Sequence, residues 1–347
     1  MAHYFDCFSV SFGKDEVFVG GKPFALGQCT TDILNLDDAV LTELDERIGK
    51  LIPAVRELLD TKTDSAACSA QEQLNAVWDL IFTLPVYRDL QMDLQTAYNL
   101  LPLLMLDQEK LAEVLDEHSE GYAMFRQLMD GLEYFPESLR VFHGQITGML
   151  SQYLEPLNRR SADAYAQAFA RYFTDMKSVE GLFGDSIFEQ SFPTKTKFAP
   201  MRQPTESGKV VLAEQAEFTY LTHFLYTDFY RALIAGNAPR QCHNCGTYFL
   251  LTAGYNTCYC NNLAPGETER TCRKVGAHKK EAQERVTATP AQKEYNKAYN
   301  RLKARKQRGK LSVGEWNIAV AKAQDWKEQT ERGALSDDEL RRQLEAL

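Results

Sequence analysis

Hydrophobic residues recur at every third or fourth position through much of the chain, which is the spacing of one face of an α-helix. Leu44, Ile48 and Leu51 follow this spacing within residues 38–60 and predict a helix that is kinked at Pro53. The same periodicity predicts further helices over residues 88–101, 107–117, 121–132, 137–154, 161–177 and 216–235. The pattern therefore favours a mainly α-helical protein.

The N-terminus has a different pattern, in which apolar and smaller polar residues alternate. Phe8, Val10 and Phe12 occupy every second position, as in a strand with one buried face. The following Gly13-Lys14-Asp15 segment is suited to a turn, and Glu16 to Val19 can run back as a second strand. We therefore expect a small β-hairpin ahead of the helices.

Local signals predict where several helices begin and end. Ser69 and Glu72 have the spacing of a capping box, and Pro85 would stop the helix that begins there. Between residues 178 and 209, glycines and prolines replace the helical pattern and predict a long loop or a short hairpin, with a strand at Lys209 to Leu212. Gly236 is suited to the C-terminal cap of the helix that ends there.

Polar caps predict four more helices towards the C-terminus. Thr271 can cap a helix that begins at Cys272. Three residue pairs have the capping-box spacing, namely Thr289 with Gln292, Ser312 with Glu315, and Ser336 with Glu339. The C-terminal part of the chain is therefore predicted to be helical as well.

The composition is that of a globular protein, with 44% hydrophobic and 25% charged residues. The apolar run from Leu100 to Leu106 is too short to cross a bilayer, so no membrane partner is expected. The first residues lack the basic start and apolar run of a signal peptide. We therefore expect a cytoplasmic protein, in which cysteine thiols stay reduced and can bind a metal.

Five of the eight cysteines fall between residues 242 and 272, and four of them have the spacing of a metal site. Cys242 and Cys245 are separated by two residues and precede Gly246, which allows the chain to turn back. Cys260 and Cys272 complete four thiolates, the ligand number of a closed structural zinc site. The sequence therefore predicts one structural zinc ion.

Several alternatives to this ligand set stay open. Cys258 can replace Cys260, because residues two apart in an extended chain point the same way, and His278 can replace Cys272. Disulfides are disfavoured because the other cysteines are scattered and no secretion signal is present. A catalytic zinc is disfavoured because four thiolates leave no open coordination position.

The segment from Pro239 to Phe249, followed by Tyr259-Cys260 and by Cys272 at the start of a basic helix, resembles the CGNR-type zinc fingers at the C-terminal end of bacterial proteins. It is also similar to uncharacterised families of bacterial mobile-element and phage proteins. The resemblance covers about 45 of the 347 residues. It implies a treble-clef-like zinc module and nucleic-acid binding, although Thr271-Cys272-Arg273-Lys274 stands where a Cys-Gly-Asn-Arg tetrapeptide would be.

The net charge of −9 hides a basic segment on an acidic chain. From Arg240 to Lys310 there are 15 lysines and arginines against 5 acidic residues, whereas the rest of the chain has 24 against 43. Lys or Arg residues recur at every fourth position beside an apolar stripe in residues 293–305. The residues predicted to bind nucleic acid are Arg273, Lys274, Lys279, Lys280, Lys293, Lys297, Arg301, Arg305 and Arg308.

Three functional hypotheses follow. The first is a non-enzymatic zinc protein that binds nucleic acid, DNA rather than RNA, through phosphate contacts. The second is a protein-interaction module whose basic tail docks on an acidic surface. The third is an enzyme in the N-terminal body, for which the sequence offers no phosphate loop, dinucleotide fingerprint or nucleophile elbow. No catalytic residue and no small-molecule ligand is predicted.

The predicted architecture has three parts. Residues 1–236 form an acidic, mainly helical body with the N-terminal hairpin, residues 237–285 form the zinc module, and residues 286–347 form a basic-to-mixed helical tail.

Overall fold

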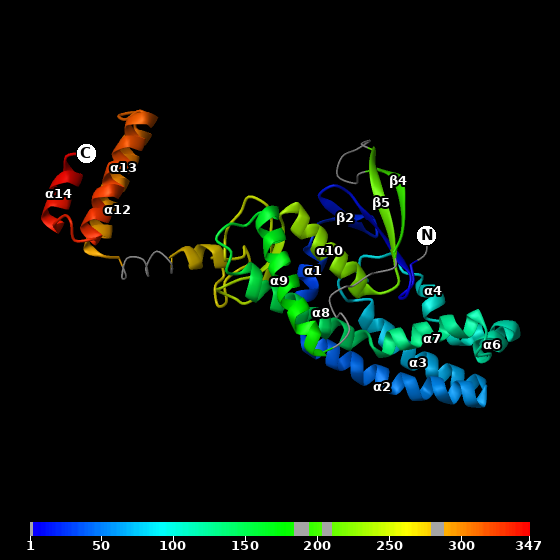
Figure 1. Cartoon of the computed structure of the whole chain (residues 1–347). Coiled ribbons are helices and arrows are strands. Elements are labelled where there is room, and N and C mark those ends of the chain that lie inside the picture. The colour runs from blue at the N-terminus through cyan, green and yellow to red at the C-terminus, as the bar shows by residue number, and fades with distance from the viewer. Residues whose placement is uncertain (1–2, 184–193, 203–209, 279–287) are drawn as a thin grey trace. The chain divides into compact units, whose positions relative to one another are not determined.

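A computed structural model describes residues 3–183, 194–202, 210–278 and 288–347 (Figure 1). The chain divides into two compact units, Met1–Cys260 and Asn261–Leu347. The boundaries at residues 236 and 285 stay a prediction. In the described ranges no helix combines the length and the apolar character that a membrane span requires.

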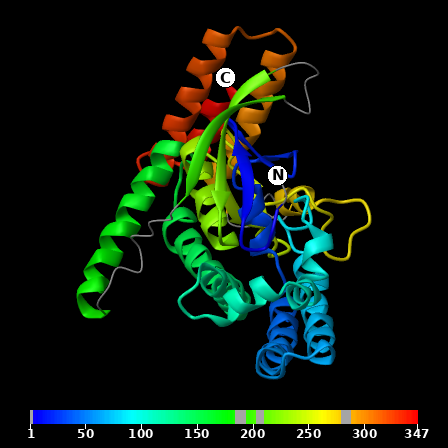
Figure 2. The same ribbon diagram turned by 90° about the vertical axis from the view of Figure 1, so that its right-hand side faces the viewer.

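A five-stranded antiparallel sheet lies in the first unit. Its strands are β1 Phe8–Phe12, β2 Glu16–Val19, β3 Lys22–Ala25, β4 Lys195–Arg202 and β5 Val210–Phe218. They follow the order β3-β2-β1-β5-β4. The predicted N-terminal hairpin of β1 and β2 is confirmed, with Phe12 paired to Val17. Figures 1 and 2 show β1, in blue, beside the yellow-green β5, which comes from the middle of the chain.

The predicted helix over residues 216–235 is wrong at its start. Residues 216–218 belong to β5, because Ala216 and Phe218 alternate towards the core while Glu217 between them is partly exposed. Helix α10 covers Leu221–Ala235, and Gly236 ends it in the left-handed conformation, as predicted. The expected loop or hairpin before it contains β4, and the expected strand at Lys209 to Leu212 is the start of β5, although Lys209 itself lies outside the described residues.

Ten helical segments precede β4 in the described part of the first unit. They are α1 Gln28–Leu34, α2 Asp38–Thr61, α3 Asp64–Ile81, α4 Leu94–Ala97, α5 Leu100–Leu106, α6 Gln108–Leu115, α7 Glu120–Glu133, α8 Phe135–Met149, the π-helix η1 Leu150–Leu154 and α9 Ala162–Phe183. The long periodic helices match the sequence prediction to within a few residues. The mainly α-helical character is therefore confirmed.

Two further helix predictions, those beginning near Ser69 and at residue 88, are wrong. Helix α3 begins at Asp64 and not near Ser69, because the Thr63 hydroxyl caps it by accepting a hydrogen bond from the Ala66 N–H at 3.3 Å. The single helix expected over residues 88–101 is replaced by turns, α4 and the first part of α5. Helix α1 was not predicted at all.

The carboxylate of Asp228 on α10 caps the N-terminus of α1 inside the core. It accepts hydrogen bonds from the Gly27 N–H at 2.8 Å, the Thr30 N–H at 3.0 Å and the Thr30 hydroxyl at 2.9 Å. Asp228 is fully buried, and Gly27 adopts a left-handed conformation with φ of 91°. Burial raises the pKa of Asp228 to about 6. This contact joins two helices that are far apart in the sequence.

Three helices near the C-terminus of the second unit share a small core. They are α12 Pro290–Gln307, α13 Val313–Glu331 and α14 Asp337–Glu345. Ala291, Ala298, Ala323, Leu340 and Leu344 form the core. The capping boxes predicted at Ser312 and Ser336 are confirmed. Thr289 caps α12 as predicted, but the Gln292 side chain bonds Asn296 and Lys327.

We predict that Asp228→Asn changes the pH dependence of stability. The folded protein keeps the Asp228 proton up to about pH 6, whereas the unfolded chain releases it near pH 3.8. The protonated carboxyl group therefore stabilises the folded state fully below pH 3.8, and this stabilisation is lost as the pH rises through about 6. We compare the free energy of unfolding of the unsubstituted chain with that of Asp228→Asn. The difference in favour of the unsubstituted chain should decrease by about 1 kcal/mol between about pH 5 and about pH 7. Urea unfolding at several pH values measures it, and an advantage that grows with pH would contradict the assignment.

Candidate metal centre

The first two cysteines lie in the turn of a hairpin formed by β6 Ala238–Gln241 and β7 Tyr248–Leu251. The Cys242 N–H donates to the Thr247 carbonyl at 2.9 Å, and the Gly246 N–H donates to the Cys242 carbonyl at 2.8 Å. Gly246 has a φ of 78°, a conformation that side chains disfavour. The glycine therefore allows the tight turn that presents both thiols to the same side.

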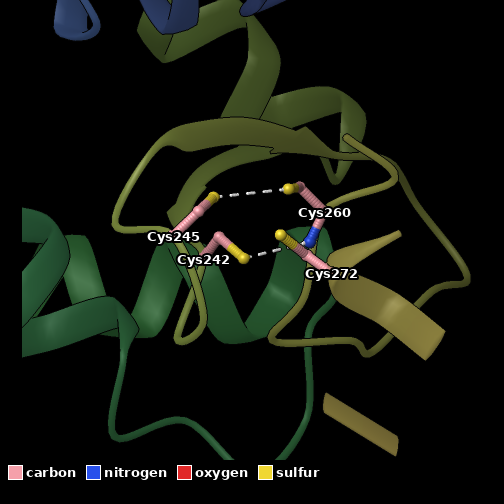
Figure 3. A group of neighbouring side chains, drawn as sticks. All are labelled: Cys242, Cys245, Cys260 and Cys272. Atoms are coloured by element: carbon pink, nitrogen blue, oxygen red, sulfur yellow. Dashed lines mark hydrogen bonds between the residues drawn. The ribbon is translucent and has the colours of Figure 1, made fainter. Parts of the chain in front are cut away.

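The sulfur atoms of Cys242, Cys245, Cys260 and Cys272 all lie within 4.8 Å of one another (Figure 3). The Cys245 and Cys260 sulfurs are 3.6 Å apart, and the Cys260 N–H donates to the Cys242 sulfur at 3.4 Å. Cys242, Cys260 and Cys272 are at most 2% exposed, and Cys245 is partly exposed. All four are free thiols.

Main-chain contacts fix the position of Cys272. Its N–H donates to the Asn262 carbonyl at 2.8 Å, and the Ala264 N–H donates to the Arg270 carbonyl at 2.9 Å. Residues 272–278 are helical, and the Thr271 hydroxyl accepts a hydrogen bond from the Lys274 N–H at 3.4 Å, as predicted for a cap. Cys272 therefore occupies the first residue of this helix.

The sulfur arrangement fits a tetrahedral metal ion. With metal–sulfur bonds of about 2.3 Å, the ligands of a zinc tetrahedron are about 3.8 Å apart. The sulfur atoms of Cys245 and Cys260, 3.6 Å apart, are already close to this separation. Since no two of the four sulfurs are more than 4.8 Å apart, the other pairs need to approach by about 1 Å at most. Metal binding by this group is therefore geometrically feasible with small side-chain movements.

The environment of Cys245 favours the thiolate form that binds metals. Burial raises the pKa of Cys245, but hydrogen bonds from Thr247 and from the Cys242 and Cys260 thiols outweigh it and lower the pKa to about 7. A substantial fraction of this thiol is therefore ionised at neutral pH.

The two alternative ligands lie outside the four-sulfur group. Cys258 is partly exposed, and its main-chain carbonyl accepts a hydrogen bond from the His243 N–H at 2.9 Å. His278 is exposed near the end of the described helix. The structure thus brings together the preferred set with Cys260 and Cys272.

Polar contacts that the sequence did not indicate attach the hairpin to the helical body. The Arg240 side chain donates to Glu155 at 2.8 Å and to the Thr257 carbonyl at 3.0 Å, while His243 contacts the same carboxylate at 2.9 Å. Although burial raises the pKa of Glu155, hydrogen bonds and positive charge, chiefly from Arg240, lower it overall. Glu155 follows η1 directly, and no sequence motif marked it.

Asn35 makes a second attachment, at the C-terminus of α1. Its side-chain amide donates to the Tyr248 carbonyl at 2.8 Å and accepts from the Tyr248 N–H at 2.7 Å. This pair imitates the bonding of a neighbouring strand, so α1 holds β7 in position. An asparagine between predicted helices gives no signal that could identify this role.

The predicted nucleic-acid-binding residues have different environments. Arg273 and Lys274 are exposed, and Lys279 and Lys280 lie outside the described residues. Lys293 and Lys297 on α12 are exposed, as is Arg308 at its C-terminal cap. Arg301, which is also exposed, and the partly buried Arg305 donate to the main-chain carbonyls of Leu344 and Leu347, so they join α12 to the α14 segment.

Residues 189–346 match a family of unknown function (DUF6076). The matched range contains the four cysteines and helices α12, α13 and α14. No curated protein and no solved structure matches the chain.

We predict that Cys242→Ser and Cys272→Ser each reduce the metal content of the purified chain to well below one ion per chain. Removal of one thiolate opens the site and withdraws much of the free energy that metal binding adds to folding. Cys258→Ser is the matched control and should keep its metal. Elemental analysis after dialysis measures the content, and retention by both ligand variants or loss by the control would contradict this ligand set.

Proposed function

We propose that the chain is a zinc-containing protein that binds nucleic acid without catalysing a reaction. In this proposal, a zinc ion on Cys242, Cys245, Cys260 and Cys272 stabilises the cysteine-rich segment, and exposed cations of α12 contact phosphates. The observation that carries the proposal is the row of solvent-exposed cations that extends along α12 from Lys293 to Arg308.

The proposed metal is zinc because four cysteine thiolates in tetrahedral arrangement are its preferred structural ligand set. A hairpin turn that supplies two ligands, followed by a helix whose first residue supplies the last, supports the treble-clef-like module that the sequence resemblance implies. Since four thiolates leave no open position, the ion would contribute to folding and not to catalysis.

The exposed cations of α12 form an extended row. Lys293, Lys297 and the capping Arg308 share one side of the helix and Lys303 projects from a neighbouring side; all four are exposed, whereas Ala298 and Leu302 face the core of the second unit. From Lys293 to Arg308 the row spans about 23 Å at 1.5 Å per residue. Because one strand of a duplex carries a phosphate about every 3.4 Å, this length passes several phosphates.

An open groove of about 680 Å³ runs along part of this row. Lys293, Lys297 and Arg341 line it together with Asn296 and Asn300. Lysine and arginine can contact phosphate oxygens through charge-assisted hydrogen bonds, and asparagine side chains can add neutral ones. Glu294 also lines the groove, but its pair with Lys297 at 2.9 Å leaves the lysine side chain 73% exposed and therefore contributes little to stability.

The contacts of α12 reduce the number of cations available for phosphates. Arg301 and Arg305 hold the α14 segment, and the Lys306 ammonium lies 4.0 Å above the Trp316 ring. Apart from Arg301, which is exposed but bonded to Leu344, the exposed cations from Lys293 to Arg308 number four. With four phosphate contacts, the logarithm of the binding constant for duplex DNA should fall with the logarithm of the salt concentration with a slope of about −3.6.

The triple variant Lys293→Glu, Lys297→Glu and Arg308→Glu tests this proposal. We expect its affinity for duplex DNA to fall at least tenfold. The slope of the logarithm of the binding constant against the logarithm of the salt concentration should become less steep by about 3, because three phosphate contacts disappear. Fluorescence anisotropy of the zinc-loaded full chain, titrated with duplex DNA, single-stranded DNA and RNA at two salt concentrations, measures both quantities.

The matched control is Lys50→Glu, Arg56→Glu and Lys110→Glu, which changes net charge equally at exposed positions of the first unit. It should reduce binding much less than the α12 variant. Equal losses in the two variants would overturn the proposed interface, and absence of binding at low salt would overturn nucleic-acid binding itself. The second outcome would favour an acidic protein surface as the partner of α12.

A further inference from the structure

A cavity of about 700 Å³ in the first unit contains none of the four cysteines of the candidate metal centre in its lining. Part of its wall is an aromatic stack in which the Trp78 and Phe82 rings lie 5.3 Å apart at 6°. The Phe5 ring adds to this wall, 5.5 Å from Trp78. Pockets of this volume and aromatic lining are typical of small-molecule sites.

The outer part of the cavity is also apolar. Met92 and Leu128 are partly buried, and Met124 is 69% exposed at the rim. Methionine side chains are flexible and polarisable, so they adapt to ligands of different shape. This region can therefore cover an aromatic or apolar body that packs against Phe82, the partly exposed member of the aromatic wall.

Hydrogen bonds fix the rim before any ligand binds. The Asp93 N–H donates to the His3 carbonyl at 2.9 Å, and the Tyr4 hydroxyl donates to the Asp93 carboxylate at 3.3 Å. Asp93 also caps α4 by accepting from the Thr96 N–H at 3.1 Å and the Thr96 hydroxyl at 2.8 Å. The segment of residues 3–7 is thereby tied to the start of α4, and the cavity is largely preformed.

The charges around the cavity are predominantly negative. Three carboxylates line it, those of Asp6, Asp93 and Glu217, against one lysine, Lys195. The Lys195 ammonium is paired with Glu217 at 3.3 Å and its side chain is 88% exposed. Burial lowers the pKa of His3, so this lining residue is neutral at neutral pH. The cavity therefore favours cations over anions.

Asp6 is a lining carboxylate whose charge is offset only in part, by a hydrogen bond to its own backbone. It is partly buried, and across the described ranges no ion pair to its side chain is present. Burial raises the pKa of Asp6, as expected for a carboxylate without a compensating cation. A bound cation would recover the free energy that this burial costs.

We propose that this cavity binds an organic cation, an amine carried on an aromatic or apolar body. The ammonium group contacts Asp6, and the body packs against the partly exposed Phe82, which Trp78 supports from behind, and beneath Met124. The inference rests on the first unit alone and goes beyond the proposed nucleic-acid interface, so either can fail without the other.

Three probes with one aromatic body and different charges test the proposal. Naphthylmethylamine, naphthalenemethanol and naphthoate are titrated separately into the zinc-loaded full chain by isothermal titration calorimetry. We expect the amine to bind most tightly, the alcohol more weakly and the carboxylate weakest. Equal affinities, tightest binding of the carboxylate, or no binding of the amine at millimolar concentration would overturn the proposal.

Two variants locate the site. Asp6→Asn removes the charge at a position in a tight turn that tolerates asparagine, and should weaken amine binding about tenfold while leaving the alcohol unchanged. Met124→Lys places a cation at the exposed rim and should also weaken amine binding several-fold. The control Ile234→Lys changes an equally exposed apolar residue on α10 that does not line the cavity, and should have no effect.

A circular-dichroism spectrum and an unfolding curve confirm that each variant is folded before titration. Amine affinity that is unchanged in both Asp6→Asn and Met124→Lys would place the binding elsewhere and overturn the assignment of this cavity. A loss of amine affinity in Ile234→Lys equal to that in Met124→Lys would also overturn it, because the effect would then be one of net charge alone.

Discussion

The convergence of four thiols is the constraint on which the cysteine-rich segment depends. Cys242, Cys245, Cys260 and Cys272 bring their sulfurs within 4.8 Å, although up to 30 positions of sequence separate them. Thiols are weak hydrogen-bonding groups, and ionised thiolates at this distance would repel one another. Residues 252–256 between the second and third cysteines are exposed and add no apolar core. A metal ion bound by the four sulfurs would supply the attraction that the side chains alone lack.

The helical body prepares the position of this segment through a short series of polar contacts. Asp228 caps α1 inside the core, and the far end of α1 carries Asn35, which bonds both main-chain groups of Tyr248. Arg240 and His243 meet at Glu155 beside η1. These contacts hold the β6–β7 hairpin at both strands, so the turn with the first two cysteines is attached to a large core. We infer that the body orients the metal site while the ion closes the remaining loop.

The sequence predicts those features that depend on local spacing. The four-cysteine group, the N-terminal hairpin and α2 follow from short-range patterns, and the structure contains all three. Features set by distant partners were missed or misplaced. The start of the helix expected at residue 216 was wrong because Ala216 and Phe218 join β5, whose neighbours lie at the N-terminus and in β4. Periodicity also identified a basic helix in α12, but not that Arg301 and Arg305 bond the α14 segment, since that depends on tertiary contacts.

We propose that a single zinc ion bound by four thiolates holds the cysteine-rich segment together. X-ray absorption at the zinc edge of the full chain, purified without added metal, tests this claim most directly. We predict about four sulfur neighbours at about 2.3 Å and no nitrogen or oxygen in the first coordination sphere. Fewer sulfur neighbours with a nitrogen ligand at about 2.0 Å, or a chain that carries no zinc, would contradict it.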